Sequence, residues 1–177
     1  MIFKAKTLQQ VLADEIRDLH SMEMLQLKAY GQMARAASSA DLQRLFYRHL
    51  EQTKSGLLRI ERVAKSLGVS LFSKKSEGMM GLLADLSKKV ESPASSARDI
   101  QLVCLAQKMS HYKWVGYSSG QIMAGLLGLA ETMKLLQMTL DDETQSQAEL
   151  GELGTNFNPC VAFERESRNV GKERKAS

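Results

Sequence analysis

The strongest constraint on the fold is a helical spacing of apolar residues that recurs in four long segments. The segments cover residues 7–37, 40–67, 96–126 and a last stretch that ends near residue 153. In each segment, apolar side chains fall on one face when successive residues are placed about 100° apart around a helix. The chain contains only two prolines, and its many Ala, Leu, Gln, Lys and Glu residues favour helix. The sequence therefore predicts an all-α protein built on four long helices.

The breaks between these segments predict how the helices are connected. Ser38 and Ser39 form so short a break that the first two helices must make an antiparallel hairpin. Gly125 and Gly128 bracket a similar turn between the last two helices, and a shorter helix at 77–90 lies on the crossover between the hairpins. Two hairpins joined in this way form a four-helix bundle. We expect this bundle to span residues 1–154, followed by a polar, mobile tail over residues 155–177.

The same spacing predicts which residues face the interior of the bundle. On the second helix they are Leu42, Phe46, His49, Thr53, Leu57, Ile60 and Ala64. On the third helix they are Ile100, Cys104, Gln107, His111, Val115, Ser118, Ile122 and Gly125. Both faces include polar side chains, which a dry core does not favour.

Four ionisable side chains are predicted to meet near the middle of the bundle, namely Glu23, His49, His111 and Glu143. Glu23 and His49 lie at similar distances on either side of the first hairpin turn, and His111 and Glu143 lie so on either side of the second. Buried ionisable groups must be paired, hydrogen-bonded or bound to metal, because desolvating them alone is costly. Helix bundles build metal sites from inward Glu and His residues, so these four are candidate metal ligands. A hydrogen-bonded network of the same residues without metal is the alternative.

Composition and charge exclude several classes of protein. No apolar run reaches the roughly 18 residues of a membrane-spanning helix, and no signal peptide is evident, so we expect a cytoplasmic protein without a membrane partner. Cys104 and Cys160 are expected to be free thiols. The net charge of +4 is spread over short basic pairs such as Lys74–Lys75, so nucleic acid is not an expected partner.

Four short stretches resemble a known protein family. They run from Ala36 to Leu42, His49 to Thr53, Ala106 to Tyr112 and Leu135 to Glu143. In order and spacing they resemble the YciE/YciF-like proteins of bacteria, over about residues 7–153. Proteins of that family are ferritin-like four-helix bundles linked to stress responses. The resemblance therefore implies a ferritin-like bundle, a homodimer and a rubrerythrin-like di-metal centre.

The chain departs from the family pattern at several acidic positions. Acids of the family are replaced here by Gln52, Met80, Ser110, Lys113 and Gln147. A di-iron site needs about four carboxylates and two histidines. Of that set the chain keeps Glu23, His49, His111 and Glu143. The comparison with the family therefore predicts that di-metal chemistry has been reduced or lost.

Three functions are compatible with the sequence. The favoured one is a dimeric, stress-associated binding or protective protein with a degraded di-metal centre, no cofactor and no enzymatic activity. The alternative is a rubrerythrin- or catalase-like metalloprotein that uses the four candidate ligands and iron or manganese for peroxide chemistry. A nucleic-acid-compacting protein ranks last, because the basic residues of the tail are mixed with acidic ones.

Overall fold

The computed structural model describes residues 6–72 and 75–156 and confirms the predicted all-α four-helix bundle. Residues 157–177, and with them most of the predicted tail and Cys160, lie outside the described residues. The helices are α1 (Leu8–Ala36), α2 (Ala40–Ser66), α3 (Glu77–Leu83), α4 (Leu86–Glu91), α5 (Ser96–Leu126) and α6 (Ala130–Asn156). Within the described ranges, no helix is both long and apolar enough to cross a membrane.

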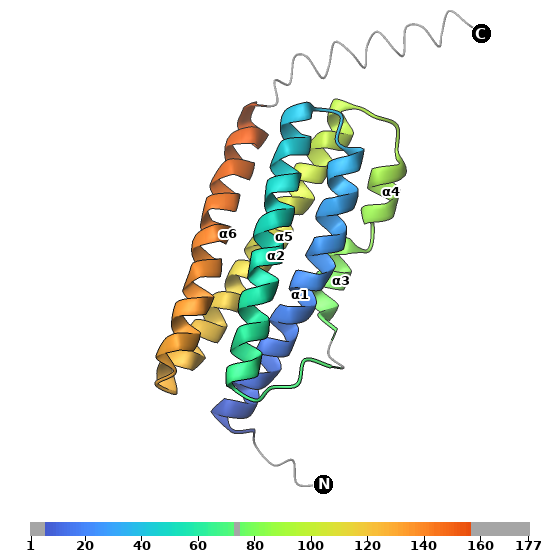
Figure 1. Ribbon diagram of the computed structural model, residues 1–177. Coiled ribbons are helices and arrows are strands. Elements are labelled where there is room, and N and C mark those ends of the chain that lie inside the picture. Colours follow the sequence, from blue (N-terminus) through green and yellow to red (C-terminus); the bar gives the residue numbers. More distant parts are fainter. Residues whose placement is uncertain (1–5, 73–74, 157–177) are drawn as a thin grey trace, which may run out of the picture.

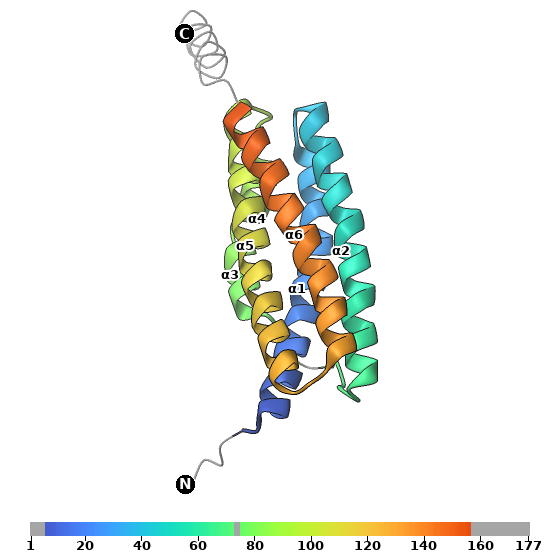
Figure 2. The ribbon, with the colours of Figure 1, turned by 90° about the vertical axis from the view of Figure 1, so that its left-hand side faces the viewer.

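The two predicted hairpins pack side by side. Helices α1 and α2 form one hairpin, and α5 and α6 form the other (Figure 1). Helix α1 packs against α5, and α2 packs against α6, so each long helix touches two others (Figure 2). The crossover returns along the outside of the bundle, where α3 and α4 contact α1 and α5. Each of the four long helices therefore presents one face to a shared interior.

The helix ends follow from local chemistry. Thr7, Ser39 and Ser95 are N-caps whose side-chain oxygens accept hydrogen bonds from backbone N–H groups of the first turn. Gly68 and Gly128 follow α2 and α5 with φ values of 64° and 68°. This left-handed conformation favours glycine and ends a helix.

The crossover differs from its prediction. In place of one helix over residues 77–90, the structure has two short helices that break at Ala84 and Asp85. Gly78 and Gly81 lower the helical propensity of this segment, and Asp85 favours the start of a new helix over the interior of a long one. Met79 is buried on α3, so the crossover still contributes to the core.

The buried face of α5 also differs from its prediction. On α2, the predicted inward residues Leu42, Phe46, His49, Thr53, Ile60 and Ala64 are buried, which confirms that face. On α5, the predicted face is wrong, since Ile100, Cys104, His111, Val115, Ile122 and Gly125 are exposed. The residues that point inward are Leu102, Ala106, Met109, Ser110, Lys113, Gly116, Tyr117, Gly120 and Ala124.

Small residues explain why α5 turns this other face to the interior. A Cβ atom on Gly116 would lie 3.0 Å from the side chain of Leu19, and one on Gly120 would lie 3.4 Å from Leu136. The backbone of α5 therefore approaches α1 and α6 closely along this face. The spacing of large apolar residues alone does not reveal such a contact, because α5 carries apolar side chains on its outer side as well.

The first turn of α5 fastens the α1–α2 turn. The buried carboxylate of Asp99 accepts hydrogen bonds from the backbone N–H groups of Ser38 and Ser39, at 2.9 and 3.1 Å. The neighbouring Arg98 donates to the carbonyl oxygens of Ala36 and Ser92. These bonds join the two hairpins at one end of the bundle.

Candidate functional site, a buried lysine and carboxylate cluster

A buried lysine lies at the centre of the bundle. The Nζ atom of Lys113, on α5, is 2.8 Å from Glu23 Oε2 on α1 and 2.8 Å from Glu143 Oε1 on α6. Lys113 is only 1% exposed and Glu23 is 0% exposed. One ammonium group therefore pairs with carboxylates from two other helices, away from solvent.

Two hydroxyl groups complete the pairing of the carboxylates. Tyr117 donates its O–H to Glu23 Oε1 at 2.6 Å, and Ser110 donates to Glu143 Oε2 at 2.7 Å. Every carboxylate oxygen of both glutamates thus accepts at least one hydrogen bond, which lowers the cost of burying the charges. Ser110, Lys113 and Tyr117 can act together because their spacing places them on one face of α5. These five residues are called the Lys113 cluster below.

Helix α2 leaves room for the carboxylate of Glu23, because it carries a glycine, Gly56, beside it. A Cβ atom at Gly56 would lie 2.4 Å from Glu23 Oε1 and 2.9 Å from its Cδ atom. Only glycine at this position lets the carboxylate of Glu23 lie against the α2 backbone while it accepts from Lys113 and Tyr117. All four long helices therefore take part in the arrangement.

The pKa shifts in the cluster follow from burial and pairing. Burial raises the pKa of Glu23, and Lys113 and Tyr117 offset only part of that shift. Burial alone would lower the pKa of Lys113, but Glu143 and Glu23 outweigh it and leave the pKa raised. The amine of Lys113 therefore stays protonated at neutral pH and has no lone pair for use as a nucleophile or base.

A buried histidine lies in the same interior as the Lys113 cluster. His49 on α2 is 2% exposed, and its ring packs edge-on to that of Tyr30 with a centroid distance of 5.4 Å. Neither ring nitrogen has a hydrogen-bond partner among the described residues, and Glu149 Oε2 lies 3.6 Å from Nε2. Burial lowers the pKa of His49 to about 4, although Glu143 and Glu149 favour its protonated form. The ring is therefore neutral at pH 7.

The structure separates one predicted ligand from the other three. Glu23, His49 and Glu143 are buried in the interior, as expected. His111 is exposed, on the outer side of α5, and lines an open groove with Leu82 of α3. The expectation that His111 points inward is wrong because the closely packed face of α5 is the one that carries Lys113. Whether the other three bind a metal stays a prediction.

The sequence interpretation missed Lys113 as a core residue. There Lys113 appears only among the residues that replace acids of the family pattern. Two signals could have revealed its position. Lys113 shares a helical face with Gly116, Gly120 and Tyr117, and inward glutamates on other helices need a cationic partner.

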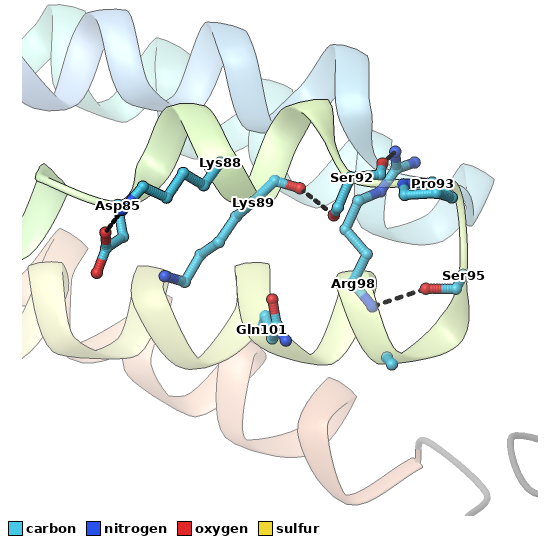
Figure 3. A pocket seen from close by; sticks show the side chains of 9 residues that line it. Asp85, Lys88, Lys89, Ser92, Pro93, Ser95, Arg98 and Gln101 are labelled. Carbon is cyan, nitrogen blue, oxygen red and sulfur yellow. Dashed lines mark hydrogen bonds and ion pairs between the residues drawn. The ribbon is translucent and has the colours of Figure 1, made fainter.

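Apart from the buried cluster, a polar pocket lies on the surface at the α4–α5 connection (Figure 3). Lys88, Lys89 and Arg98 contribute positive charge there, and Asp85 contributes negative charge. Lys88 donates to Asp85 at 3.2 Å, while Arg98 bonds the backbone of Ser92 at 2.7 Å. The first contact lies within the crossover and the second joins the end of the crossover to α5, so we assign the pocket a structural role.

Sequence comparison identifies the family of the chain. The family model described as "Domain of unknown function (DUF892)" matches residues 7–157. The chain belongs to the DUF892 family. Protein YciF of Escherichia coli K12 is 31% identical over 153 residues, which cover 85% of this chain and 92% of YciF. The predicted resemblance to YciF-like proteins is therefore confirmed.

Solved structures support the same fold for this DUF892 chain. The crystal structure of the E. coli stress protein YciF matches with a TM-score of 0.82 and covers 86% of this chain and 98% of its own. A Rhodopseudomonas palustris protein matches at 0.78, with 25% identity over 85% and 98% of the two chains. A ferritin-like di-iron carboxylate protein from Bacillus anthracis matches at 0.67, with 15% identity over 85% and 99%. This last match shows the ferritin-like fold alone.

The Lys113 cluster does not fit the metal pair that ferritin-like bundles build from inward carboxylates and histidines. The ammonium of Lys113 lies between the two carboxylates that would have to bind the metal. Its positive charge repels a divalent cation at that place. Among the described residues, no group of three or more His, Cys, Asp or Glu side chains could hold a metal ion.

Proposed function

We propose that this DUF892 protein is a stress-associated, ferritin-like binding or protective protein that does not carry out di-iron redox chemistry. In this proposal its di-metal centre is degraded, and an internal salt bridge takes its place. The stress association rests on the similarity to YciF, which is described as a stress protein.

The proposal rests on the position of the Lys113 ammonium, which lies 2.8 Å from a carboxylate oxygen of Glu23 and 2.8 Å from one of Glu143. An ion pair with two carboxylates neutralises part of their charge without any external cofactor. The residues around it are buried, so the cluster offers no surface to a substrate. These properties suit a structural core better than a reaction centre.

Metal analysis tests the proposal. The protein is produced with iron and manganese supplied, and its metal content is measured after dialysis. We expect far less than one ion per chain and no peroxide consumption above that of buffer. A content near the roughly two ions of a di-metal centre would overturn the proposal. It would favour the rubrerythrin- or catalase-like alternative, in which iron or manganese acts on peroxide.

We further propose that the protein is a homodimer that pairs through the outer face of α5. Val115, Ile122 and Leu126 are exposed there by 58, 63 and 72%, and their spacing places them on one side of the helix. No charged residue occurs between Trp114 and Ala130. A second copy can therefore lie against this face without like-charge repulsion, as a two-fold symmetric contact requires.

Light scattering after size-exclusion chromatography tests the dimer. Ile122→Glu is expected to give monomers that keep their helical circular dichroism, because it buries a charge in the contact. Leu58→Glu is the matched control, since Leu58 is 67% exposed on α2, away from the α5 face. It should leave the dimer intact. A monomeric parent protein, or an Ile122→Glu dimer of unchanged strength, would contradict this interface.

A further inference from the structure

We infer that Lys113 is the residue that keeps divalent metal ions out of the core, because its ammonium occupies the place where the buried carboxylates would bind them. The inference rests on the proposed function, since it explains why the core would hold no metal. It adds a specific cause, a single side chain whose replacement should create a metal site.

The first step of the argument is geometric. A divalent ion at the centre would need Glu23 Oε2 and Glu143 Oε1, which are the two oxygens that lie 2.8 Å from Lys113 Nζ. Metal–oxygen bonds are shorter, about 2.0–2.2 Å for Zn²⁺ or Mg²⁺, so both carboxylates would close around an ion placed there. Ammonium and metal ion therefore compete for the same two atoms and the same volume.

The second step concerns charge. Glu23 and Glu143 carry two negative charges when ionised, and Lys113 supplies one positive charge. Removal of the ammonium leaves two buried carboxylates without a cation, which is strongly unfavourable. A divalent cation is the simplest species that restores neutrality.

The third step concerns the ligands that remain. His49 is buried and has two nitrogens without hydrogen-bond partners among the described residues. Neutral imidazole and carboxylate oxygens are good ligands for Mn²⁺ and Zn²⁺. A carboxylate at position 113 would add a third carboxylate to those of Glu23 and Glu143, and His49 shares their interior.

The test uses Lys113→Glu, which adds a ligand, and Lys113→Gln, which removes only the charge. Lys108→Glu is the matched control, because Lys108 is exposed on the same helix and the charge change is the same. Each full-length protein is stripped with chelator and then dialysed against MnCl₂. Bound manganese is measured by atomic emission, and the unfolding midpoint is measured by circular dichroism with and without MnCl₂.

The parent and Lys108→Glu should bind almost no manganese and keep the same midpoint in both buffers. Lys113→Glu should bind about one ion per chain, and its midpoint should rise by about 5–10 °C at a roughly hundredfold excess over Kd. Lys113→Gln should also gain manganese, but more weakly. If Lys113→Glu is unfolded in chelator, recovery of helix on addition of manganese is the expected readout.

Two outcomes would overturn the inference. In the first, neither variant gains manganese or recovers structure with it, while the parent is also free of metal. The proposed function then stands, but Lys113 is not what excludes the ion. In the second, the parent binds as much manganese as Lys113→Glu, which contradicts both the inference and the proposed function.

Discussion

Replacement of His49 with phenylalanine should make the protein less sensitive to acid. The imidazole is buried, packs against Tyr30, and has no hydrogen-bond partner for either nitrogen among the described residues. Phenylalanine keeps a ring of similar shape in that space and cannot be protonated. At neutral pH the variant should therefore be about as stable as the parent, or slightly more stable, because two unsatisfied nitrogens are removed.

The size of the effect follows from the pKa of His49. That pKa is lowered from 6.5 to about 4, so the folded state resists a proton that the unfolded state accepts. A depressed pKa gives stability that is present above pH 6.5 and is lost as the pH falls toward 4. Each pKa unit corresponds to about 1.4 kcal/mol, so the loss reaches about 3 kcal/mol in the parent. This is a large part of the roughly 5–15 kcal/mol that stabilises a domain.

Urea unfolding followed by circular dichroism, at several pH values between 7 and 4, measures this loss. Other groups titrate in the same range in both proteins, so the quantity of interest is the difference between their two curves. His111→Phe is the control, because that histidine is exposed. It should keep the acid response of the parent. If His49→Phe loses as much free energy of unfolding as the parent between these pH values, the burial argument for His49 is wrong.

Three further predictions test other parts of the core. Gly56→Ala should destabilise the protein by about 2 kcal/mol in urea unfolding, because the new Cβ overlaps the hydrogen-bonded carboxylate of Glu23. Gly31→Ala is the control, because a Cβ there meets only ordinary contacts, and it should raise the free energy of unfolding by up to about 1 kcal/mol. Asp99→Ala should cost about 3 kcal/mol, because two backbone N–H groups of the α1–α2 turn lose their acceptor, and an unchanged unfolding midpoint would refute that role. Burial raises the pKa of Tyr117 well above 10.0, so the stability it contributes is present below pH 10.0 and is lost above it. Tyr117→Phe should therefore show a shallower alkaline loss of stability than the parent.

The helices could be predicted from the sequence because their ends and faces carry local signals. Ser39 and Ser95 cap the helices that follow them, and Gly68 follows the end of α2. The inward face of α2 is also predictable, because its apolar and charged residues lie on opposite sides. Local chemistry thus determines most of the architecture.

The face of α5 could not be predicted in the same way. Its outer side carries Val115 and Ile122, which are as apolar as core residues, while its inner side carries Lys113 and Ser110. The spacing of apolar residues assigns the apolar side to the core, and for α5 this assignment is wrong. The inner side is decided by contacts with Glu23 and with α1, which involve residues far apart in the sequence.

The candidate site was predictable only in part, for the same reason. Glu23, His49 and Glu143 were located correctly because they lie on faces whose orientation the apolar pattern determines. His111 was misplaced because it depends on the rotation of α5. A lysine is rarely buried unless it is paired, so the role of Lys113 becomes evident only when both glutamates are seen around it.

The Lys113 cluster also determines how the helices align lengthwise. Surfaces of leucine, alanine and methionine can interlock at more than one offset, because one turn of such a surface resembles the next. A slide of α1 along α5 by one turn, about 5.4 Å, would separate Glu23 from both Lys113 and Tyr117. The carboxylate of Glu23 would then be buried without its partners, while Lys113 kept only Glu143, at a cost of several kcal/mol. The bundle therefore has one alignment in which its charges are matched, and an alternative alignment would have to recover that cost through apolar packing alone.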